Sequence, residues 1–257
     1  MLEKMLFRLY NNGERTCFFM IDKLKQYINE AENIVFFGGA GVSTESGLKD
    51  FRSEDGIYSM KFDYPPEIML SHSFFKKHPN EFYAFYREMM IAKDVLPNAA
   101  HYAIAKLESM GKVKAVITQN IDGLHQLAGS KNIFELHGST KRNYCIRCGK
   151  FFSEELVNSS KEAPVCECGG LVKPDVVLYE EPLDAKTLEG AIDAVSKAEL
   201  LIVAGTSLTV YPAAGLINYF KGKHLVLINR DATPFDDRAD LVIREPVGVT
   251  LSKVVEL

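Results

Sequence analysis

Short apolar segments alternate with helical patterns along most of the chain. Each apolar segment ends in glycine or polar residues, which is typical of strands buried in a parallel sheet. Six strands are predicted, at Ile34–Phe37, Ala115–Thr118, Ile133–Leu136, Leu200–Ala204, Leu225–Ile228 and Leu241–Ile243. Apolar residues three and four positions apart predict helices over Asp22–Ala31, Ala99–Met110 and Ala185–Ala198. The predicted fold is α/β, with a Rossmann-like, doubly wound parallel sheet that binds ligands at the carboxyl ends of its strands.

Two stretches interrupt this alternation. From Gly56 to about Leu96 aromatic residues are frequent and no strand-like segment occurs, which predicts a helical insertion. From Ser139 to Leu171 the pattern is lost. We therefore expect a sheet domain made of residues 20–55, 97–138 and 172–257. The segments 56–96 and 139–171 would form a smaller inserted domain, and residues 1–19 an extension without an assigned role.

Composition and charge narrow the possible partners. The 257 residues are 47% hydrophobic and 25% charged, as in globular proteins, and their net charge of −4 argues against a nucleic-acid binder. The apolar segments are much shorter than the roughly 20 residues that span a membrane. The first residues mix both charge signs with apolar side chains, unlike a secretory signal. We expect a cytoplasmic protein without a membrane or nucleic-acid partner.

Four of the five cysteines lie close together in the sequence. Cys145, Cys148, Cys166 and Cys168 have the spacing C-x2-C-x17-C-x-C, and glycines follow each pair. Two close pairs on separate turns can place four thiolates around a tetrahedral zinc ion. Such a closed shell leaves no open position, so the metal would support folding rather than chemistry. Two unrelated buried pairs or a redox dithiol are the alternatives.

The first predicted strand leads directly into a glycine-rich turn, Gly38-Gly39-Ala40-Gly41-Val42-Ser43-Thr44. Glycines at a strand-to-helix turn let the backbone approach a phosphate, whose charge the helix N-terminus stabilises. The third glycine of the dinucleotide fingerprint is absent, and a tight connection without a ligand is the alternative.

Polar residues follow the other predicted strands as well. These loops are Gln119-Asn120-Ile121-Asp122-Gly123, His137-Gly138-Ser139, Gly205-Thr206-Ser207 and Asn229-Arg230-Asp231. Their convergence on one sheet edge would form a nucleotide site. His137 is the histidine placed directly at a strand end, although a structural role for it is the alternative.

Taken together, the motifs resemble those of a sirtuin, an NAD-dependent protein lysine deacylase, of the compact bacterial type. The resemblance rests on GAGVSTESGLKDFRSEDGIY from Gly39, TQNIDGLHQLAGS from Thr118, ELHGS from Glu135, the four cysteines, KPDVVLYEE from Lys173 and GTSLTVYPAAG from Gly205. It implies NAD as co-substrate, one structural zinc ion, and acyl-lysine peptides or proteins as partners. The reaction would release nicotinamide and O-acyl-ADP-ribose.

The resemblance also implies a role for particular residues. His137 would be the general base, with Asn120 beside it in the catalytic site. Cofactor-binding residues would be Gly39, Ala40, Gly41, Thr44, Asp50, Phe51, Arg52, Gln119, Ile121, Asp122, Gly205, Thr206, Ser207 and Asn229. Val177 and Tyr179 would border the acyl-lysine tunnel.

The chain departs from the family pattern at several positions. Lys49 replaces a usual proline, Glu180 replaces a usual glycine, and the second cysteine pair is one residue tighter. Family members that prefer acidic acyl groups carry a Tyr-x-x-Arg pair. Here Tyr83 is followed at that spacing by Tyr86, and Arg87 comes one position late, which favours acetyl or another uncharged acyl group over succinyl. Protein ADP-ribosylation is the alternative activity, and a non-catalytic NAD-binding interaction module is the alternative class.

Overall fold

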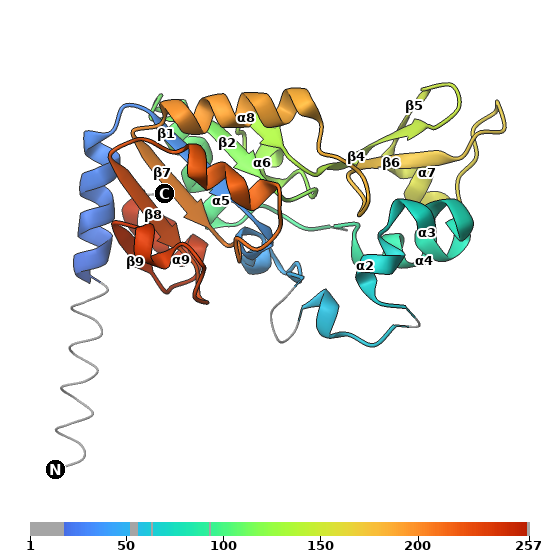
Figure 1. Cartoon of the computed structure of the whole chain (residues 1–257), viewed down its shortest axis with the longest axis horizontal. Coiled ribbons are helices and arrows are strands. Elements are labelled where there is room, and N and C mark those ends of the chain that lie inside the picture. Colours follow the sequence, from blue (N-terminus) through green and yellow to red (C-terminus); the bar gives the residue numbers. More distant parts are fainter. Residues whose placement is uncertain (1–17, 52–55, 63, 93, 256–257) are drawn as a thin grey trace, which may run out of the picture.

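A computed structural model describes residues 18–51, 56–62, 64–92 and 94–255. These residues form a large parallel sheet and a small antiparallel sheet that lie at opposite ends of the molecule (Figure 1). The polypeptide passes between the two parts more than once, because both the segment 56–96 and the segment after β3 leave the large sheet and return to it.

The large sheet contains the six predicted strands, which are confirmed. They are β1 (Ile34–Gly38), β2 (Val113–Thr118), β3 (Ile133–Glu135), β7 (Leu200–Ala204), β8 (His224–Ile228) and β9 (Leu241–Ile243). All neighbouring strands are parallel, in the order β3-β2-β1-β7-β8-β9. The strand order reverses next to β1, between β2 and β7, so the carboxyl end of β1 lies at the switch point of the sheet.

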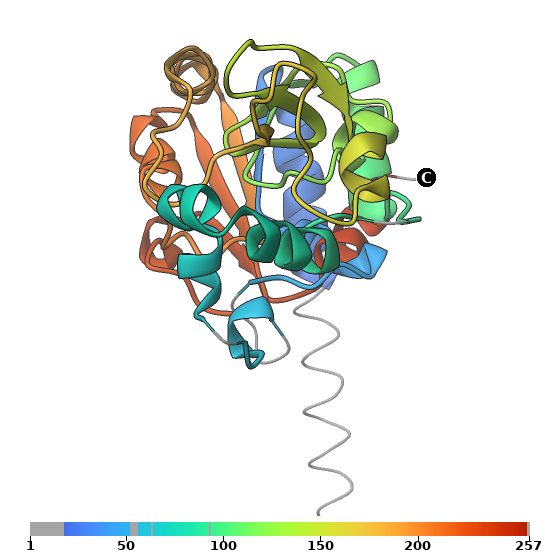
Figure 2. The ribbon, with the colours of Figure 1, turned by 90° about the vertical axis from the view of Figure 1, so that its right-hand side faces the viewer.

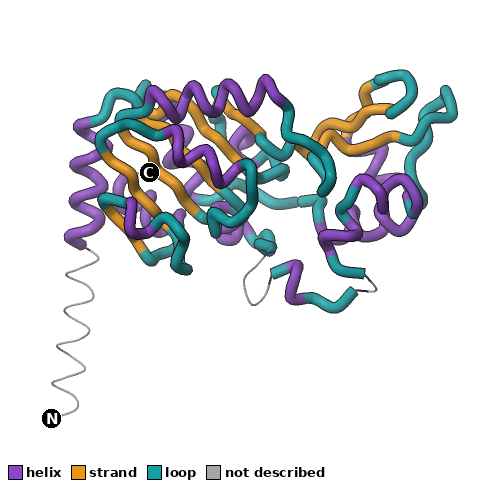
Figure 3. The backbone as a smooth tube through the Cα atoms, viewed as in Figure 1, coloured by secondary structure: helices purple, strands orange, loops and turns teal. Residues whose placement is uncertain are grey.

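Helices cover both faces of this sheet (Figure 3). Ile34 and Phe36 of β1 pack toward the helix at 18–30, α5 (Ala99–Ser109) and α9 (Val247–Val254). Val35 and Phe37 pack toward α8 (Ala185–Lys197) and the 3-10 segment η4 (Ala213–Tyr219). Burial on both faces explains why the strands read as continuous apolar runs. The three predicted helices are confirmed, and the Asn98 side chain caps α5 by accepting from the amide of Ala100 at 2.9 Å.

The small domain combines the helical insertion with the second sheet (Figure 2). Its helices are α2 (Pro66–Met69), α3 (His72–Lys77), α4 (Pro79–Met89) and α7 (Glu154–Ser159), and its strands follow the order β5 (Phe151–Ser153), β4 (Gly138–Cys145), β6 (Val172–Val176). Buried aromatic residues of α4 pack against Val176 and Leu178. The hydrophobic pattern of the sequence did not predict these strands. Strand β6 begins at Val172, directly after the predicted inserted segment 139–171, so the small sheet extends five residues beyond that segment.

No helix in the described part of the chain is long and apolar enough to cross a membrane.

Two fully buried histidines lie beneath the turn that follows β1. His101 of α5 and His125 of α6 (Leu124–Leu127) have ring centroids 4.8 Å apart. His101 Nδ1 accepts the backbone N–H of Asn98, whose side-chain amide donates to Val42 O and Ser46 Oγ. Burial lowers the pKa of His101 to about 4 and that of His125 to about 3. Both rings are therefore neutral in the folded protein at neutral pH.

The stability of the protein is expected to fall between pH 7 and pH 5 because of this pair. The unfolded chain binds protons at both histidines below about pH 6.5, whereas the folded chain does not until about pH 4 and pH 3. Stability is thus highest above pH 6.5, and the pair alone should lower the free energy of unfolding by about 4 kcal/mol at pH 5. Urea denaturation at the two pH values measures this. His125→Phe should show about half the pH dependence, and an unchanged dependence would contradict the prediction.

Candidate active site

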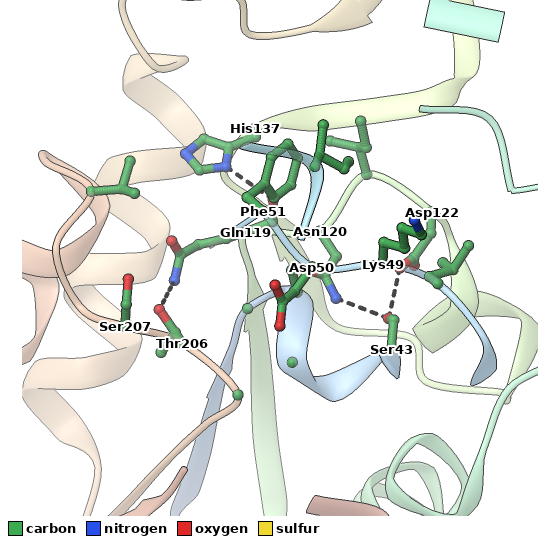
Figure 4. Close-up of a pocket in the computed structure, with 18 of the residues that line it drawn as sticks. Ser43, Lys49, Asp50, Phe51, Gln119, Asn120, Asp122, His137, Thr206 and Ser207 are labelled. Carbon is green, nitrogen blue, oxygen red and sulfur yellow. Dashed lines mark hydrogen bonds between the residues drawn. The ribbon is translucent and has the colours of Figure 1, made fainter. Parts of the chain in front are cut away.

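A cleft of about 610 Å³ lies between the carboxyl edge of the large sheet and the small domain (Figure 4). Nearly all residues predicted for the site line it: Gly39, Ala40, Gly41, Thr44, Asp50, Phe51, Gln119, Asn120, Ile121, Asp122, His137, Val177, Tyr179, Gly205, Thr206, Ser207 and Asn229. Arg52 lies outside the described residues. The strand-end loops therefore converge on one cavity, as their positions in a parallel sheet predicted.

The glycine-rich turn after β1 packs directly on the turn after β7. It comprises the 3-10 segments η1 (Ala40–Val42) and η2 (Thr44–Ser46), and the Gly41 amide donates to Gly205 O at 2.8 Å. A Cβ on Gly41 would lie 2.8 Å from the Gly205 Cα, and Gly205 itself has φ +58°. These glycines are required by the close approach of two backbones, and their own amides are used within the protein, because the Gly205 amide in turn donates to Ile228 O at 3.0 Å.

A buried hydrogen-bonded group stands at one side of the cleft. The Ser43 hydroxyl donates to Asp122 Oδ2 at 2.7 Å and accepts from Asn120 Nδ2 at 3.0 Å. Burial raises the pKa of Asp122, while bonds from the Leu124 amide and Ser43 oppose that rise. The group fixes the side chains of Asn120 and Asp122 in place. Ser43 lies within the glycine-rich motif, but its hydrogen bond to Asp122 joins residues 79 positions apart, and no pattern in the sequence indicates that contact.

His137 has a defined tautomer. Its Nδ1 lies 2.9 Å from the Gln119 carbonyl oxygen, which can only accept, so Nδ1 carries the proton and Nε2 is left with a lone pair. Burial lowers the pKa of His137 below its ordinary value, against the smaller opposing effect of this bond. Gly138 follows at φ +76°, where a Cβ would lie 1.9 Å from Asp175 O. The histidine is therefore neutral and held by the backbone on both sides.

Gln119 links this histidine to the turn after β7. Its Nε2 donates to Thr206 Oγ1 at 3.0 Å, and its own backbone amide donates to Gly38 O. Gln119 thus joins the loops after β2, β3 and β7, and Figure 4 shows its bonds to His137 and Thr206 as dashed lines that are separate from those of Ser43.

The end of the cleft nearest the small domain is apolar. Ile57, Leu70, Met89, Ile91 and Leu178 line it and belong to the small-domain core or pack against it. Tyr86, which occupies the Arg position of the Tyr-x-x-Arg pair, also lines the cleft. The guanidinium of Arg87 is engaged elsewhere, because it donates to the carbonyl oxygens of Lys161 and Glu162 at 2.9 and 3.2 Å.

The segment after β6 forms another wall and contains the unusual Glu180. Its φ of +75° is a left-handed conformation that glycine adopts at lower cost, which explains the usual glycine at this position. The Glu180 carboxylate accepts from the Ser73 amide at 2.9 Å and from its hydroxyl at 2.7 Å. Tyr179 pairs through its backbone with Leu70 and His72, and its hydroxyl bonds to that of Tyr58. The glutamate therefore anchors this wall to α3.

The four clustered cysteines converge on one point. Their Sγ atoms all lie within 4.8 Å of one another, with Cys145 and Cys168 3.4 Å apart and Cys148 and Cys166 3.7 Å apart. The thiols are free rather than joined in disulfides. Sulfurs bound to one tetrahedral zinc lie about 3.8 Å apart, so the cluster fits that ion. The nearest neighbours come from different pairs, which disfavours the alternative of two separate dithiols.

Glu45, which sequence reasoning passed over, connects the glycine-rich turn to the last helix. Its carboxylate accepts from the amides of Gly248 at 2.5 Å and Val249 at 3.2 Å, in the first turn of α9. A Cβ on Gly248 would lie 2.9 Å from both carboxylate oxygens. A negative charge at a helix N-terminus is stabilising, so Glu45 fixes the turn against α9.

Comparison with known proteins agrees with this geometry. The family model described as the Sir2 family matches residues 39–212. A Clostridium acetobutylicum protein named NAD-dependent protein deacetylase is 60% identical over 91% of this chain and 98% of its own length. A solved Sir2 variant with deacetylated p53 peptide and 3'-O-acetyl ADP ribose has a TM-score of 0.84 at 41% identity, covering 92% of this chain and 97% of that one. A Sir2 homologue solved with NAD also reaches 0.84, at 38% identity over 91% and 92% of the two chains. The chain belongs to the Sir2 family.

Proposed function

We propose that the protein is an NAD-dependent protein lysine deacetylase that releases nicotinamide and O-acyl-ADP-ribose. The observation that carries this proposal is the neutral His137, whose Nε2 lone pair is free for a ligand in a cleft with a glycine-rich turn at its other end. Proteins similar over almost the whole chain are named NAD-dependent protein deacetylases. Solved Sir2 structures contain NAD, acetylated peptide and acetyl ADP ribose.

The residues of the cleft divide by chemistry. The glycine-rich turn would hold the pyrophosphate of NAD through the Ala40 amide, because the Gly41 amide and the Thr44 hydroxyl already donate to Gly205 O and Gly41 O. Gly39, Gly41, Thr44, Asp50, Phe51 and Arg52 would surround the pyrophosphate. The segment Gly205–Ser207 and Asn229 would hold the adenosine half. Gln119, Ile121 and Asp122 would shape the pocket for ribose and nicotinamide, with Asn120 held by Ser43. These assignments, the ranges of the two domains and a cytoplasmic location stay predictions.

NAD supplies an electrophilic ribose carbon once nicotinamide departs, and the acyl oxygen of the substrate attacks it. His137 would then remove a proton from a ribose hydroxyl through Nε2, because Nδ1 is occupied by its bond to the Gln119 carbonyl. The hydroxyl oxygen would attack the former amide carbon, the lysine amine would leave with a proton, and one water molecule would complete the conversion to O-acyl-ADP-ribose. The lowered pKa keeps this nitrogen unprotonated at neutral pH. The peptide would add as a strand beside Val177 and Tyr179.

The acyl group is expected to be uncharged. Among the described residues, the lysine and arginine side chains that line the cleft are Lys49 and Arg230, and neither belongs to the small-domain core that forms its apolar end. Arg87 is turned toward two backbone carbonyls. A buried carboxylate without a partner is strongly disfavoured. Steady-state kinetics with one peptide sequence, prepared once with acetyl-lysine and once with succinyl-lysine, tests this. The value of kcat/KM should be at least about a hundredfold higher for the acetyl-lysine peptide. Equal rates would contradict the prediction.

Mass spectrometry of the same reaction tests the function itself. We expect deacylated peptide, nicotinamide and O-acyl-ADP-ribose in equal amounts. An ADP-ribosylated protein would indicate the alternative transferase activity, and NAD binding without nicotinamide release would indicate a non-catalytic module.

Loss of Glu45 is expected to weaken NAD binding selectively. Glu45→Ala removes both hydrogen bonds to α9, and charge-assisted bonds of this kind contribute about 1–3 kcal/mol each. We expect the KM for NAD to rise about tenfold, with kcat and the KM for peptide within about twofold, and Glu45→Gln to recover part of the loss. Glu32→Ala, which removes an exposed carboxylate outside the cleft, is the control. A fall in apparent kcat with both KM values unchanged would indicate partial unfolding instead, and an equal rise in both KM values would contradict a selective effect on NAD.

A further inference from the structure

A second hollow lies beside the cleft, between α8 and η4. It has a volume of about 350 Å³, and its walls include Leu188 and Ile192 of α8 and Leu216 and Tyr219 of η4. No Asp, Glu, Lys or Arg is among the described residues that line it. We call this hollow the α8–η4 groove.

The groove adjoins the cleft. Tyr211 and Pro212 line both cavities, and Leu183, which directly precedes α8, lines the cleft. The Tyr211–Pro212 segment is therefore the common border of the two cavities. A substrate chain that leaves the cleft over this segment would reach the mainly apolar lining of the groove, in which Asn218 is the amide side chain.

The rim of the groove exposes two large aromatic side chains. Tyr211 is 67% exposed and Tyr219 is 47% exposed. Gly215 lies between them in the sequence, and a Cβ there would come within 3.7 Å of the Tyr211 ring. The absence of a side chain at position 215 thus leaves space next to that ring. Contiguous exposed apolar surface of this kind marks binding sites.

We propose that the α8–η4 groove is an exosite for the acylated protein, which takes one apolar side chain of leucine or phenylalanine type from the substrate. The proposal rests on the proposed function, because the occupant belongs to the chain whose acyl-lysine enters the cleft. An extended chain advances about 3.3 Å per residue and turns alternate side chains to opposite sides. A residue a few positions from the acyl-lysine can therefore reach the groove while the lysine stays in its tunnel.

This contact is expected to strengthen binding of the peptide and to leave the rate of the chemical step unchanged. Full burial of a leucine side chain contributes the equivalent of about ten- to a hundredfold in affinity. The groove is open on one side, so we expect about a tenfold fall in the peptide KM with kcat unchanged.

The experiment moves a single leucine along an acetyl-lysine peptide whose other residues are glycine, serine and asparagine. The leucine is placed from two to six residues on either side of the acetyl-lysine, and an acetyl-lysine peptide with no leucine is the reference. Steady-state kinetics gives kcat and KM, and fluorescence anisotropy of the labelled peptides without NAD gives the affinity directly. One position of the leucine should improve both KM and affinity about tenfold.

Two substitutions test whether the groove causes this gain. Tyr219→Glu places a charge at the rim, and Gly215→Leu fills the space beside Tyr211. Either should abolish the gain from leucine, with the reference peptide and the KM for NAD unaffected, since neither residue lines the cleft. Tyr102→Glu is the matched control, because Tyr102 is 45% exposed and lines neither cavity. Circular dichroism and thermal melts establish that the variants fold.

Three outcomes would overturn the proposal: no leucine position improves affinity, the gain persists in both groove variants, or the gain disappears equally in Tyr102→Glu. A gain that falls as the protein concentration rises would mean that a second copy of the chain occupies the groove, and would also overturn it. Failure to deacylate even the reference peptide would count against the proposed function instead, while the anisotropy measurement would still decide the exosite.

Discussion

His137→Ala is expected to lower NAD-dependent deacylation by about a hundredfold to ten-thousandfold, the usual contribution of a general base. The ring is held by its bond to the Gln119 carbonyl, and no other imidazole lines the cleft among the described residues. The affinity for NAD and for the acetylated peptide should change little, because the glycine-rich turn and the walls of the cleft do not depend on the ring. Product formation by mass spectrometry, with NAD binding by calorimetry, measures both effects.

His78→Ala serves as the control, because His78 has a half-exposed side chain and lies outside the cleft. The pH profile provides an independent readout. Burial lowers the pKa of His137, so the base stays deprotonated below pH 6.5 and activity should decline only at a pH below that value. A purified, folded His137→Ala variant that keeps most of its activity would contradict the assignment.

Removal of the metal from the four-cysteine cluster is the second large effect. Structural zinc sites contribute on the order of 10 kcal/mol to folding, and Cys145 pairs directly with Val172 of β6 in the small sheet. The chain that follows β6 contains Val177 and Tyr179, which line the cleft. Because β6 pairs with the strand that carries Cys145, loss of the metal should disorder this wall of the cleft. We expect Cys148→Ser to lose bound zinc, melt at a lower temperature and lose deacylation activity by at least about tenfold.

Elemental analysis should give one zinc per chain in the parent protein and little in Cys148→Ser. The control is Cys17→Ser, which changes the cysteine outside the cluster and should keep both zinc and activity. NAD binding should survive in part, since the turn after β1 is held by the turn after β7 through the hydrogen bond from the Gly41 amide to Gly205 O. Full activity in a zinc-free protein would rule out this role for the metal.

The large sheet could be predicted because each of its strands is recognisable from the hydrophobicity of a few consecutive residues. Helices cover both faces, so each strand is a run of apolar residues and each boundary is a glycine or a polar residue. The small sheet carries no such signal. Strand β4 has the sequence GSTKRNYC, and its buried positions include Thr140 and Asn143, which a hydrophobic pattern cannot identify.

The same distinction applies to the candidate site. The strand-end loops could be identified because the topology of a parallel sheet brings their carboxyl ends to one edge. Ser43 and Glu45 could not, since their importance depends on partners about 80 to 200 residues away. For Tyr86 the family pattern indicated the position, and the structure adds that the residue lines the cleft. The family resemblance supplied particular roles, whereas the reason for the left-handed backbone at Glu180 required the structure.

Strand β4 starts directly after His137 and ends at Cys145, so one short element joins the proposed base to a proposed metal ligand. This arrangement constrains how the protein can evolve. An insertion or deletion in the regularly paired part of β4, Asn143–Cys145, would shift the metal ligand relative to the histidine. Loops of the zinc module on the far side of the cysteines carry no such constraint. Variation in length among relatives should therefore accumulate in those loops, and any variation within β4 should be confined to the irregular stretch between Ser139 and Asn143.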